Sequence, residues 1–351
     1  MDLKTHYSGK RILVTGHTGF KGVWLCVMLN QLGAEVHGLA LPPDTVPDLF
    51  SEVRLDELIE SSTFLDIRDS VALGEYLQNK QFDLIFHLAA QAIVSEGYKD
   101  PRGTFETNVM GTVNLLVQIP HIVGLKGLVC STTDKVYSND GFSHDFKESD
   151  RLGGTDPYSG SKAATENVME SLYYLLEEKN MSLISCRAGN VIGGGDWSKN
   201  RLVPDAIRAL ISGSKLEIRH PNSTRPWQHI LDCLHGYLLV GKRILENDVP
   251  EINSFNFGPK NSTSVDKLLT ILKDIIGIEY VVDDLSKVGK EAESLTLDSS
   301  KAERLLKWKT TYSSEGAIRE TANWYRSYVN GENPRSLIRF SIERFLKDEV
   351  I

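Results

Sequence analysis

The segment RILVTGHTGFKG, residues 11–22, decides the fold of this chain. Its first five residues form a short, mostly apolar run that stops at a glycine, as a buried parallel strand does. Glycines then recur at every third position (Gly16, Gly19 and Gly22), and the run VWLCVML at 23–29 predicts a helix. Strand, glycine loop and helix in this order are typical of a dinucleotide-binding unit, where backbone amides approach a pyrophosphate at the helix N-terminus. A glycine turn without a ligand is the alternative, and the flanking strand and helix favour the cofactor.

Further apolar segments predict the other strands of the first half, at 35–41, 62–65, 83–91, 124–131 and 182–187. Helical segments separate them, so the pattern predicts an α/β fold with a Rossmann-type, doubly wound parallel sheet. We expect this domain at 1–188, with later segments at about 228–258 returning to it. Residues 189–351 predict mainly a smaller α+β substrate-binding lobe. The site should then lie between the lobes, at the carboxyl edge of the sheet.

The predicted cofactor site draws on three loops. The glycine loop supplies Gly16, Thr18, Gly19, Phe20 and Lys21, a second loop Asp66 and Ile67, and the end of the strand at 83–91 Leu88, Ala89, Ala90 and Gln91. Asp66 could contact adenine, or it could belong to a solvated turn. The strand at 35–41 ends in Ala40-Leu41-Pro42-Pro43, without the acid that grips a ribose or a base for a 2′-phosphate. The missing base favours NAD over NADP. His87 is expected to be a hydrogen-bonded core residue.

Composition excludes several classes of partner. The 351 residues carry a net charge of −8, which gives no electrostatic reason to expect nucleic acid or an anionic membrane. The four cysteines are scattered (Cys26, Cys130, Cys186 and Cys233), so we expect buried thiols in a reducing compartment rather than a metal site or disulfides. No run of about 20 apolar residues occurs. A cytoplasmic protein is expected.

The second chemical signal is the pair Tyr158 and Lys162, four residues apart, which would share one face of a helix. A nearby ammonium can lower the pKa of a phenol toward neutrality and make it a usable acid and base. The run STTDK at 131–135 adds hydroxyls and two titratable groups, Asp134 and Lys135. Tyr and Lys also recur at this spacing by chance on ordinary amphipathic helices, so the pair gains its weight from the preceding dinucleotide motif.

Longer strings carry a family resemblance. TGHTGFKG, HLAAQ at 87–91, TNVMGT at 107–112, TTDK at 132–135 and YSGSK at 158–162 resemble the extended short-chain dehydrogenases/reductases that act on nucleotide sugars. LPPDTVPDLF at 41–50, AGNVIGGGDW at 188–197, RPWQHI at 225–230 and LDSSKAERLLKWK at 297–309 resemble the nucleotide-sugar 4,6-dehydratases within them. The resemblance covers nearly the whole chain and implies NAD, a nucleotide-sugar substrate (CDP-glucose above all), deoxysugar biosynthesis of the O-antigen kind, and a homodimer through the helices beginning near Thr107 and Tyr158.

The resemblance also implies roles for five catalytic residues. Tyr158, poised by Lys162 and Thr133, would take the proton of the C4 hydroxyl as hydride leaves C4. Asp134 would protonate the departing C6 hydroxyl, and Lys135 would remove the C5 proton. A carboxylic acid can donate a proton and a desolvated lysine can accept one, so the side chains suit these roles. Lys135 could instead contact phosphate or serve the structure.

Substrate contacts are implied for six residues of the second half: Asn190, Trp197, Arg201, Arg219, Arg225 and His229. Guanidinium groups suit a diphosphate because they donate in a planar fork at constant charge. Trp197 could cover the base or fill the core. Two segments depart from the family pattern, Ser95-Glu96 where arginines are usual and Lys290 where a histidine is usual, and both bear on the choice of sugar or base.

Two other functions remain open at this point. The first is an oxidoreductase or epimerase on the same fold that uses Tyr158 but loses no water. Asp134 and Lys135 favour the dehydratase, since neither alternative enzyme needs an acid at C6 and a base at C5. The second is a noncatalytic nucleotide-sensing protein, against which Thr133, Tyr158 and Lys162 together argue.

Overall fold

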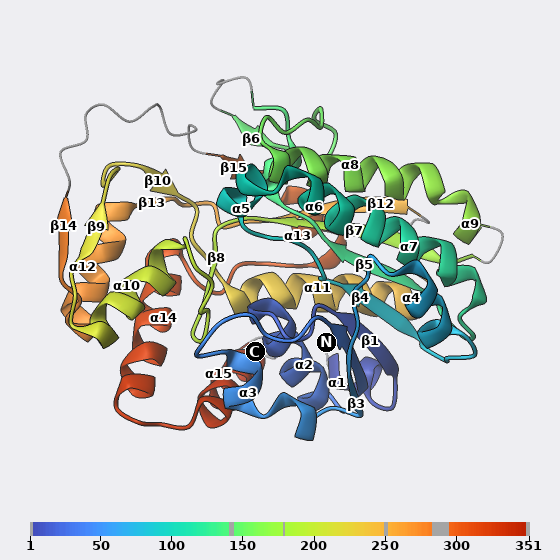
Figure 1. The fold of residues 1–351 in the computed structure, drawn as a ribbon, viewed down its shortest axis with the longest axis horizontal. Helices are drawn as coiled ribbons and strands as arrows, with labels where there is room; N and C mark the ends of the chain where they lie inside the picture. Colours follow the sequence, from blue (N-terminus) through green and yellow to red (C-terminus); the bar gives the residue numbers. More distant parts are fainter. Residues whose placement is uncertain (1–2, 140–143, 178–179, 249–251, 283–294, 349–351) are drawn as a thin grey trace.

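A seven-stranded parallel sheet forms the centre of the molecule (Figure 1). This computed structural model describes residues 3–139, 144–177, 180–248, 252–282 and 295–348. The strands run in the order β12-β7-β5-β4-β1-β2-β3. Their bounds are β1 (Arg11–Thr15), β2 (Glu35–Ala40), β3 (Ser61–Phe64), β4 (Leu84–His87), β5 (Gly127–Ser131), β7 (Ser182–Ala188) and β12 (Ile252–Phe257). The order steps outward in both directions from β1 and β4, so the predicted doubly wound sheet is confirmed.

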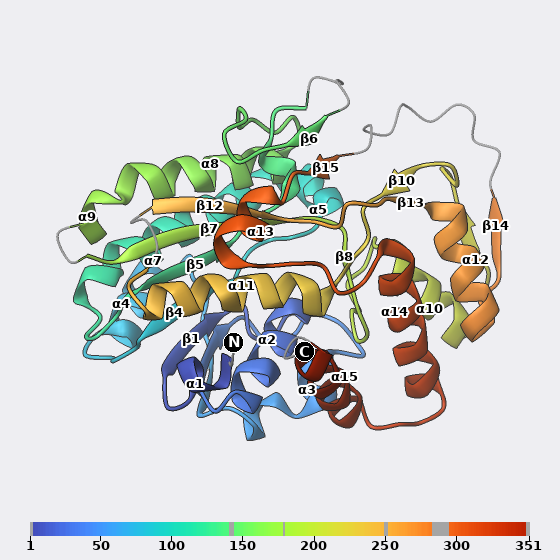
Figure 2. The ribbon, with the colours of Figure 1, turned by 180° about the vertical axis from the view of Figure 1, so that it is seen from behind.

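Helices cover both faces of this sheet, which explains why its central strands are apolar along their length. On one face lie α1 (Leu3–Tyr7), α2 (Phe20–Gln31) and α11 (Ile230–Leu245), and on the other α4 (Ser70–Leu77), α7 (Gly111–Gln118) and α8 (Pro157–Leu172) (Figures 1 and 2). Alternate residues of β1 enter different cores: Ile12 and Val14 pack with the first set of helices, Leu13 with the second. Every residue of β4, β5 and β7 is buried.

The helix that carries Tyr158 begins with a built cap. Asp156 accepts hydrogen bonds from the backbone N–H groups of Tyr158 and Ser159, and Pro157 occupies the first turn, where its missing N–H costs nothing. The sequence predicts one helix to about Lys179, but α8 ends at Leu172 and a separate α9 (Tyr174–Glu177) follows. Lys179 itself lies outside the described residues. On the same face, α5 (Val94–Lys99), α6 (Pro101–Phe105) and a π-helical segment (Glu106–Met110) lead into α7.

The second half of the chain builds small sheets beside the carboxyl edge and then returns to the main sheet. The paired strands are β8 (Val191–Ile192) with β11 (Gln228–His229), β9 (Leu216–Ile218) with β14 (Tyr280–Val282), and β10 (Thr224–Arg225) with β13 (Thr263–Ser264). A fourth strand, β15 (Thr296–Leu297), pairs with β6 (Asp145–Phe146) of the first half. The helices are α10 (Leu202–Ser212), α12 (Val265–Ile276), α13 (Ser300–Leu306), α14 (Ser314–Val329) and α15 (Pro334–Asp348).

Segments from late in the chain pack against the first half. β12 pairs with β7, and α11 packs against β5 and β7. In addition α15 packs against α2 and against α3 (Leu49–Val53), next to the N-terminal helices (Figure 2). Both termini therefore lie on the same side of the sheet. None of the helices in the described ranges is long and apolar enough to cross a membrane.

Candidate active site

The glycine loop between β1 and α2 lies directly against the end of β4. Gly16 has a φ of +78°, and a Cβ atom there would stand 2.7 Å from the backbone nitrogen of Ala89. A Cβ on Gly22 would stand 2.1 Å from the carbonyl oxygen of Gly16. Only glycine fits these two positions. Gly19 is the N-cap residue of α2 and makes no side-chain hydrogen bond to the first turn. This leaves room at the N-terminus of the helix for a pyrophosphate.

The other residues predicted for the cofactor surround this loop. Thr18 donates its hydroxyl to the carbonyl oxygen of Leu41, 2.9 Å away, at the end of β2. Lys21 holds its ammonium 6.0 Å above the ring of Tyr237. Phe20 lies near Gly193 of the second half. The predicted residues Leu88, Ala89, Ala90 and Gln91 all directly follow β4 and are half-buried.

Asn108 fixes the end of β4 to α8; it belongs to the string TNVMGT at 107–112, but the sequence predicted no role for its side chain. Its side-chain oxygen accepts from the N–H of Gln91 at 2.8 Å, while its Nδ2 donates to the Gln91 carbonyl and, at 2.8 Å, to the hydroxyl of Ser161. Asn108 is 1% exposed. It lies in the π-helical segment, a feature that often marks functional positions but that no sequence pattern reveals.

Two further sequence predictions for this region have different outcomes. His87 is a core residue, as predicted: its two ring nitrogens lie 2.7 Å from Thr15 Oγ1 and 3.0 Å from Thr112 Oγ1. Asp66 forms an ion pair with Arg68 at 2.6 Å, and this contact lowers the pKa of its carboxyl. The ion pair favours the solvated turn as the role of the Asp66 side chain. Ile67 is buried, and its carbonyl oxygen accepts from Asn114.

The structure brings four of the predicted catalytic residues together. Tyr158 and Lys162 lie on the buried face of α8, and Thr133 and Asp134 follow the carboxyl end of β5; each of the four is no more than 9% exposed. The Thr133 side chain lies close enough to Tyr158 to oppose the rise of its pKa. The Thr133 hydroxyl lies 2.9 Å from Asp134 Oδ1. The Lys162 ammonium donates a hydrogen bond to the carbonyl oxygen of Ser131 at 3.1 Å.

Burial sets the electrostatics of this group. Burial raises the pKa of Asp134 above the ordinary value for aspartate, although Lys135 and the Thr133 hydrogen bond oppose the shift. A raised pKa favours the protonated carboxylic acid, which is the form that donates a proton. Burial likewise raises the pKa of Tyr158 and lowers the pKa of Lys162. The expected lowering of the Tyr158 pKa is therefore not found here, because desolvation of the phenolate outweighs the opposing effects of the Thr133 side chain and the Arg201 charge.

Lys135 lies on the exposed side of the same turn, a 3₁₀ helix at Asp134–Val136. Its charge opposes the rise of the Asp134 pKa that burial causes. Its predicted role as base at C5 stays a prediction.

Two predicted substrate residues lie close to the catalytic group. Asn190 has a φ of +52°, and its Nδ2 lies 3.5 Å from Asp134 Oδ2. Arg201 precedes α10 and its Nη1 lies 3.4 Å from the Asp196 carboxylate. Its charge opposes the rise of the Tyr158 pKa that burial causes. Arg225 is half-buried on β10, and Arg219 is exposed directly after β9.

The other two predicted substrate residues are part of the core. Trp197 is 3% exposed, donates its indole N–H to Glu52 at 3.2 Å and packs against the rings of Tyr325 and Tyr328. His229 is 4% exposed, and burial lowers its pKa to about 3. A neutral imidazole brings no positive charge to a diphosphate. Substrate contacts by these two side chains stay predictions that the geometry does not favour.

Of the segments that depart from the family pattern, Ser95-Glu96 lies on α5, where the Glu96 carboxylate pairs with Lys99 at 2.7 Å. Lys290 lies outside the described residues.

A dinucleotide loop facing a buried Tyr-Lys pair and a Thr-Asp turn is the arrangement of the extended short-chain dehydrogenases/reductases. The family model for GDP-mannose 4,6 dehydratase matches residues 13–321, and the chain belongs to this dehydratase family. It is 39% identical over 342 residues to the CDP-glucose 4,6-dehydratase of Salmonella typhimurium (strain LT2). The matched region covers 94% of each of the two chains.

More distant relatives share the architecture. The chain is 25% identical over 339 residues to the UDP-glucose 4-epimerase of Halalkalibacterium halodurans, covering 91% of this chain and 97% of the relative. The fold matches the dTDP-glucose 4,6-dehydratase of Bacillus anthracis with a TM-score of 0.72 at 23% identity, covering 93% and 100% of the two chains. It matches the UDP-glucose 4-epimerase of Stenotrophomonas maltophila with a TM-score of 0.78 at 22% identity, covering 92% and 100%.

The buried histidines predict how stability depends on pH. His87 and His229 each have a pKa lowered to about 3 by burial, whereas an unfolded histidine titrates near 6.5. The unfolded chain therefore takes up protons that the folded chain does not, and stability is lost as pH falls below about 6.5. Between pH 7 and pH 5 each of these histidines should cost about 2 kcal/mol in the free energy of unfolding.

Urea unfolding at the two pH values measures this loss. His229→Asn removes one titrating group, and Asn can still accept the helix-capping hydrogen bond from the N–H of Leu231 that His229 Nδ1 accepts now. The variant should lose less stability than the wild type between pH 7 and pH 5. An equal loss in both proteins would show that His229 is not buried in its neutral form.

Proposed function

We propose that this chain is an NAD-dependent nucleotide-sugar 4,6-dehydratase, a lyase that converts CDP-glucose to CDP-4-keto-6-deoxyglucose and water. One observation carries the proposal: Asp134, a buried carboxyl whose raised pKa favours its acid form, accepts a hydrogen bond from Thr133 and lies near Tyr158. An enzyme that only oxidises or epimerises C4 has no use for such an acid. The similarity to the Salmonella CDP-glucose 4,6-dehydratase supports CDP-glucose as the substrate.

The residues around the glycine loop fit a dinucleotide. Any side chain at Gly16 or Gly22 would fill the space that a close backbone turn needs, and Gly19 leaves the N-terminus of α2 open. β2 ends at Ala40 and is followed by Leu41, with no cation for a 2′-phosphate, which supports NAD over NADP. The glycine loop and the residues that follow β4 would hold NAD, which would supply a reversible hydride acceptor for the sugar.

The chain's own residues would handle the protons. Tyr158 would take the proton of the C4 hydroxyl while Thr133 holds the same oxygen by its hydroxyl. Lys162 lies four residues later on the same helix face, and its ammonium would stabilise the phenolate that the reaction requires. Burial alone would keep Tyr158 protonated, so positive charge at this site is needed for its function as a base.

Loss of water follows from the acidity that a C4 ketone gives to C5. Lys135 would accept the C5 proton, and Asp134 would donate its proton to the C6 hydroxyl, so that one water leaves. The amide of Asn190 lies within 3.5 Å of the Asp134 carboxyl and would help to orient it. Arg201, Arg219 and Arg225 are the guanidinium groups we assign to the substrate diphosphate, with Arg225 as the main contact.

The test is to incubate the purified protein and NAD with CDP-, dTDP-, GDP- and UDP-glucose and to follow the products by mass spectrometry. We expect loss of the mass of one water from CDP-glucose. Tyr158→Phe should abolish the reaction, whereas Asp134→Asn should still oxidise C4 but slow elimination by about 100- to 10,000-fold. Asn keeps the shape of the side chain and cannot donate the proton. Equal loss of oxidation and elimination in Asp134→Asn would contradict the role given to Asp134.

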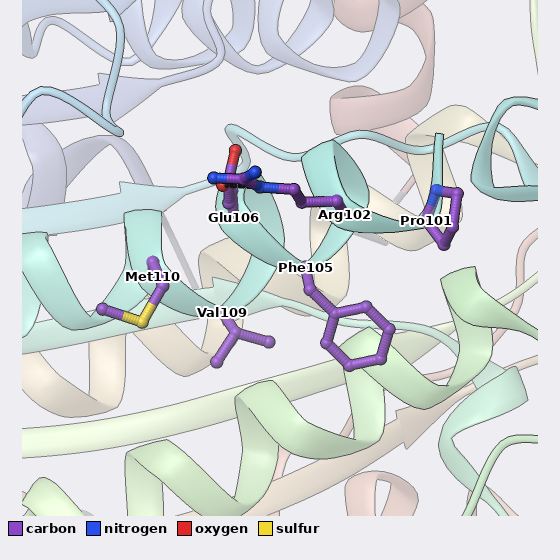
Figure 3. A pocket seen from close by; sticks show the side chains of 6 residues that line it. All are labelled: Pro101, Arg102, Phe105, Glu106, Val109 and Met110. Atoms are coloured by element: carbon purple, nitrogen blue, oxygen red, sulfur yellow. Dashed lines mark hydrogen bonds and ion pairs between the residues drawn. The ribbon is translucent and has the colours of Figure 1, made fainter. Parts of the chain in front are cut away.

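We also propose that the enzyme is a cytoplasmic homodimer, joined through the helices that begin near Thr107 and Tyr158, which are the π-helical segment with α7 and α8, together with the adjoining α6. All four cysteines are buried and free, which suits a reducing compartment. The helical face carries exposed apolar side chains, with Phe105 at 41% and Met110 at 50% exposed. A hollow of about 470 Å³ lies among them and is lined by Pro101, Arg102, Phe105, Glu106, Val109 and Met110 (Figure 3). A second copy would cover this apolar surface.

Sedimentation of point variants tests the dimer. Phe105→Glu places a charge on the proposed contact and should give a monomer, because a buried unpaired carboxylate opposes association. Phe340→Glu is the matched control, since Phe340 is 64% exposed on α15 and lies outside the proposed contact. A dimer that survives Phe105→Glu, or dissociates equally with Phe340→Glu, would place the contact elsewhere.

A further inference from the structure

A buried ion pair between Glu166 and Arg187 has no part in the chemistry described above. Glu166 lies on α8 and is 8% exposed; Arg187 lies on β7 and is 4% exposed. The guanidinium donates twice to the carboxylate, from Nε at 2.9 Å and from Nη2 at 2.7 Å. Ser185 donates to the same carboxylate at 2.8 Å. A buried pair persists only when its remaining hydrogen-bonding groups also find partners, so the other contacts of this pair matter.

One of those contacts leads to the start of the catalytic turn. Thr132 donates its hydroxyl to Glu166 Oε1 at 2.7 Å, and its N–H donates to the carbonyl oxygen of Cys186 at 2.9 Å. Thr132 directly precedes Thr133 and Asp134. Glu166 stands four residues after Lys162 and eight after Tyr158, so the three side chains share one face of α8.

The other contact leads to the end of the same turn. Arg187 Nη1 donates to the phenolic oxygen of Tyr137 at 2.8 Å, and its guanidinium lies 5.0 Å from the centre of the Tyr137 ring. The Tyr137 hydroxyl in turn donates to Asn256 on β12 at 2.7 Å. Tyr137 directly follows the 3₁₀ turn Asp134–Val136. The ion pair is therefore bonded to the residues on both sides of the turn.

The turn itself is weakly held by its own backbone. The N–H of Val136 lies 3.4 Å from the Thr133 carbonyl, the N–H of Tyr137 lies 3.5 Å from the Asp134 carbonyl, and the N–H of Lys135 lies 3.3 Å from the Thr133 hydroxyl. Good N–H···O bonds are shorter, at 2.7–3.2 Å. The position of Thr133 and Asp134 must depend on bonds made from outside the turn.

We propose that Glu166 and Arg187 act as a clamp that positions the catalytic turn, holding Thr132 at its start and Tyr137 at its end. The pair touches neither the sugar nor the reacting atoms, so these are positioning residues. The inference rests on the proposed function, because the turn it positions carries the acid of the dehydration. A clamp of this kind fixes Asp134 relative to Tyr158, whose helix also bears Glu166.

The test cuts the two links and leaves the ion pair in place, since removing Glu166 or Arg187 alone would bury an unpaired charge and threaten folding. Thr132→Val removes the first link and Tyr137→Phe the second, each with little change of shape. Thr132→Ser keeps the hydroxyl and is the rescue variant. Ser185→Ala is the matched control, because it removes a bond to the same carboxylate from β7, away from the turn.

We expect Thr132→Val and Tyr137→Phe each to lower kcat by about 10- to 100-fold with a smaller change in KM, because misplacing a catalytic group by about 1 Å costs that much. Thr132→Ser should restore most of kcat, and Ser185→Ala should keep it even where it lowers the melting temperature. Equal kcat in Thr132→Val and Ser185→Ala would overturn the clamp.

Hydrogen exchange of the peptide that spans residues 132–138 supplies a readout that needs no substrate. Exchange should become faster in Thr132→Val and Tyr137→Phe and stay unchanged in Ser185→Ala. Unchanged exchange in the first two would overturn the clamp whatever reaction the wild type catalyses. A wild type that is inactive on every nucleotide sugar, with exchange as expected, would overturn the proposed function and leave the clamp supported.

Discussion

Everything chemical in this molecule depends on the burial of a few polar side chains at the carboxyl edge of one parallel sheet. Helices on both faces and the small sheets beside the edge exclude water from Tyr158, Lys162 and Asp134. Removal of water raises the pKa of the two acids and lowers that of the ammonium, so each group is held toward its neutral form. For Asp134 that form is the acid a dehydration requires. For Tyr158 the neutral form is the phenol, so nearby cations are needed to stabilise the phenolate that acts as a base.

Burial of the charged pair Glu166 and Arg187 would destabilise the fold unless its hydrogen-bonding groups found partners. Besides the two bonds within the Glu166–Arg187 pair, the carboxylate accepts from Thr132 and Ser185, and the guanidinium donates to Tyr137 and to the carbonyl oxygen of Glu148. Because those partners come from the catalytic turn and its surroundings, the network that stabilises two buried charges also fixes the geometry of the site. Stability and function share these contacts in this protein.

The sequence predicts the parts of the fold that are local. The segment at 11–22 specifies strand, loop and helix through short-range glycine and apolar patterns, and the structure confirms the parallel sheet that follows from it. Residues four apart lie on the same side of a helix, so the shared helix face of Tyr158 and Lys162 can be predicted from the sequence alone. Similarity to known proteins, rather than these patterns, provided the roles of Asp134 and Lys135.

Long-range packing is what the sequence does not reveal. The contact of α15 with α2 joins segments some three hundred positions apart, and nothing in either segment marks the other as its partner. Trp197 and His229 stand in family motifs, yet the tertiary fold packs both into the core. Likewise the direction of the Tyr158 pKa shift depends on how deeply α8 is covered, and the network of Glu166 and Arg187 depends on how α8 meets β7.

The central claim is that hydride moves within one sugar, from C4 to C6, with loss of water between the two transfers. Its most direct test is CDP-glucose that carries deuterium at C4, incubated with the enzyme and NAD, with the product examined by NMR spectroscopy. The account predicts a 4-keto sugar whose new C6 methyl group carries the deuterium. Deuterium retained at C4, deuterium left in a reduced cofactor, or a methyl group without the label would each contradict it.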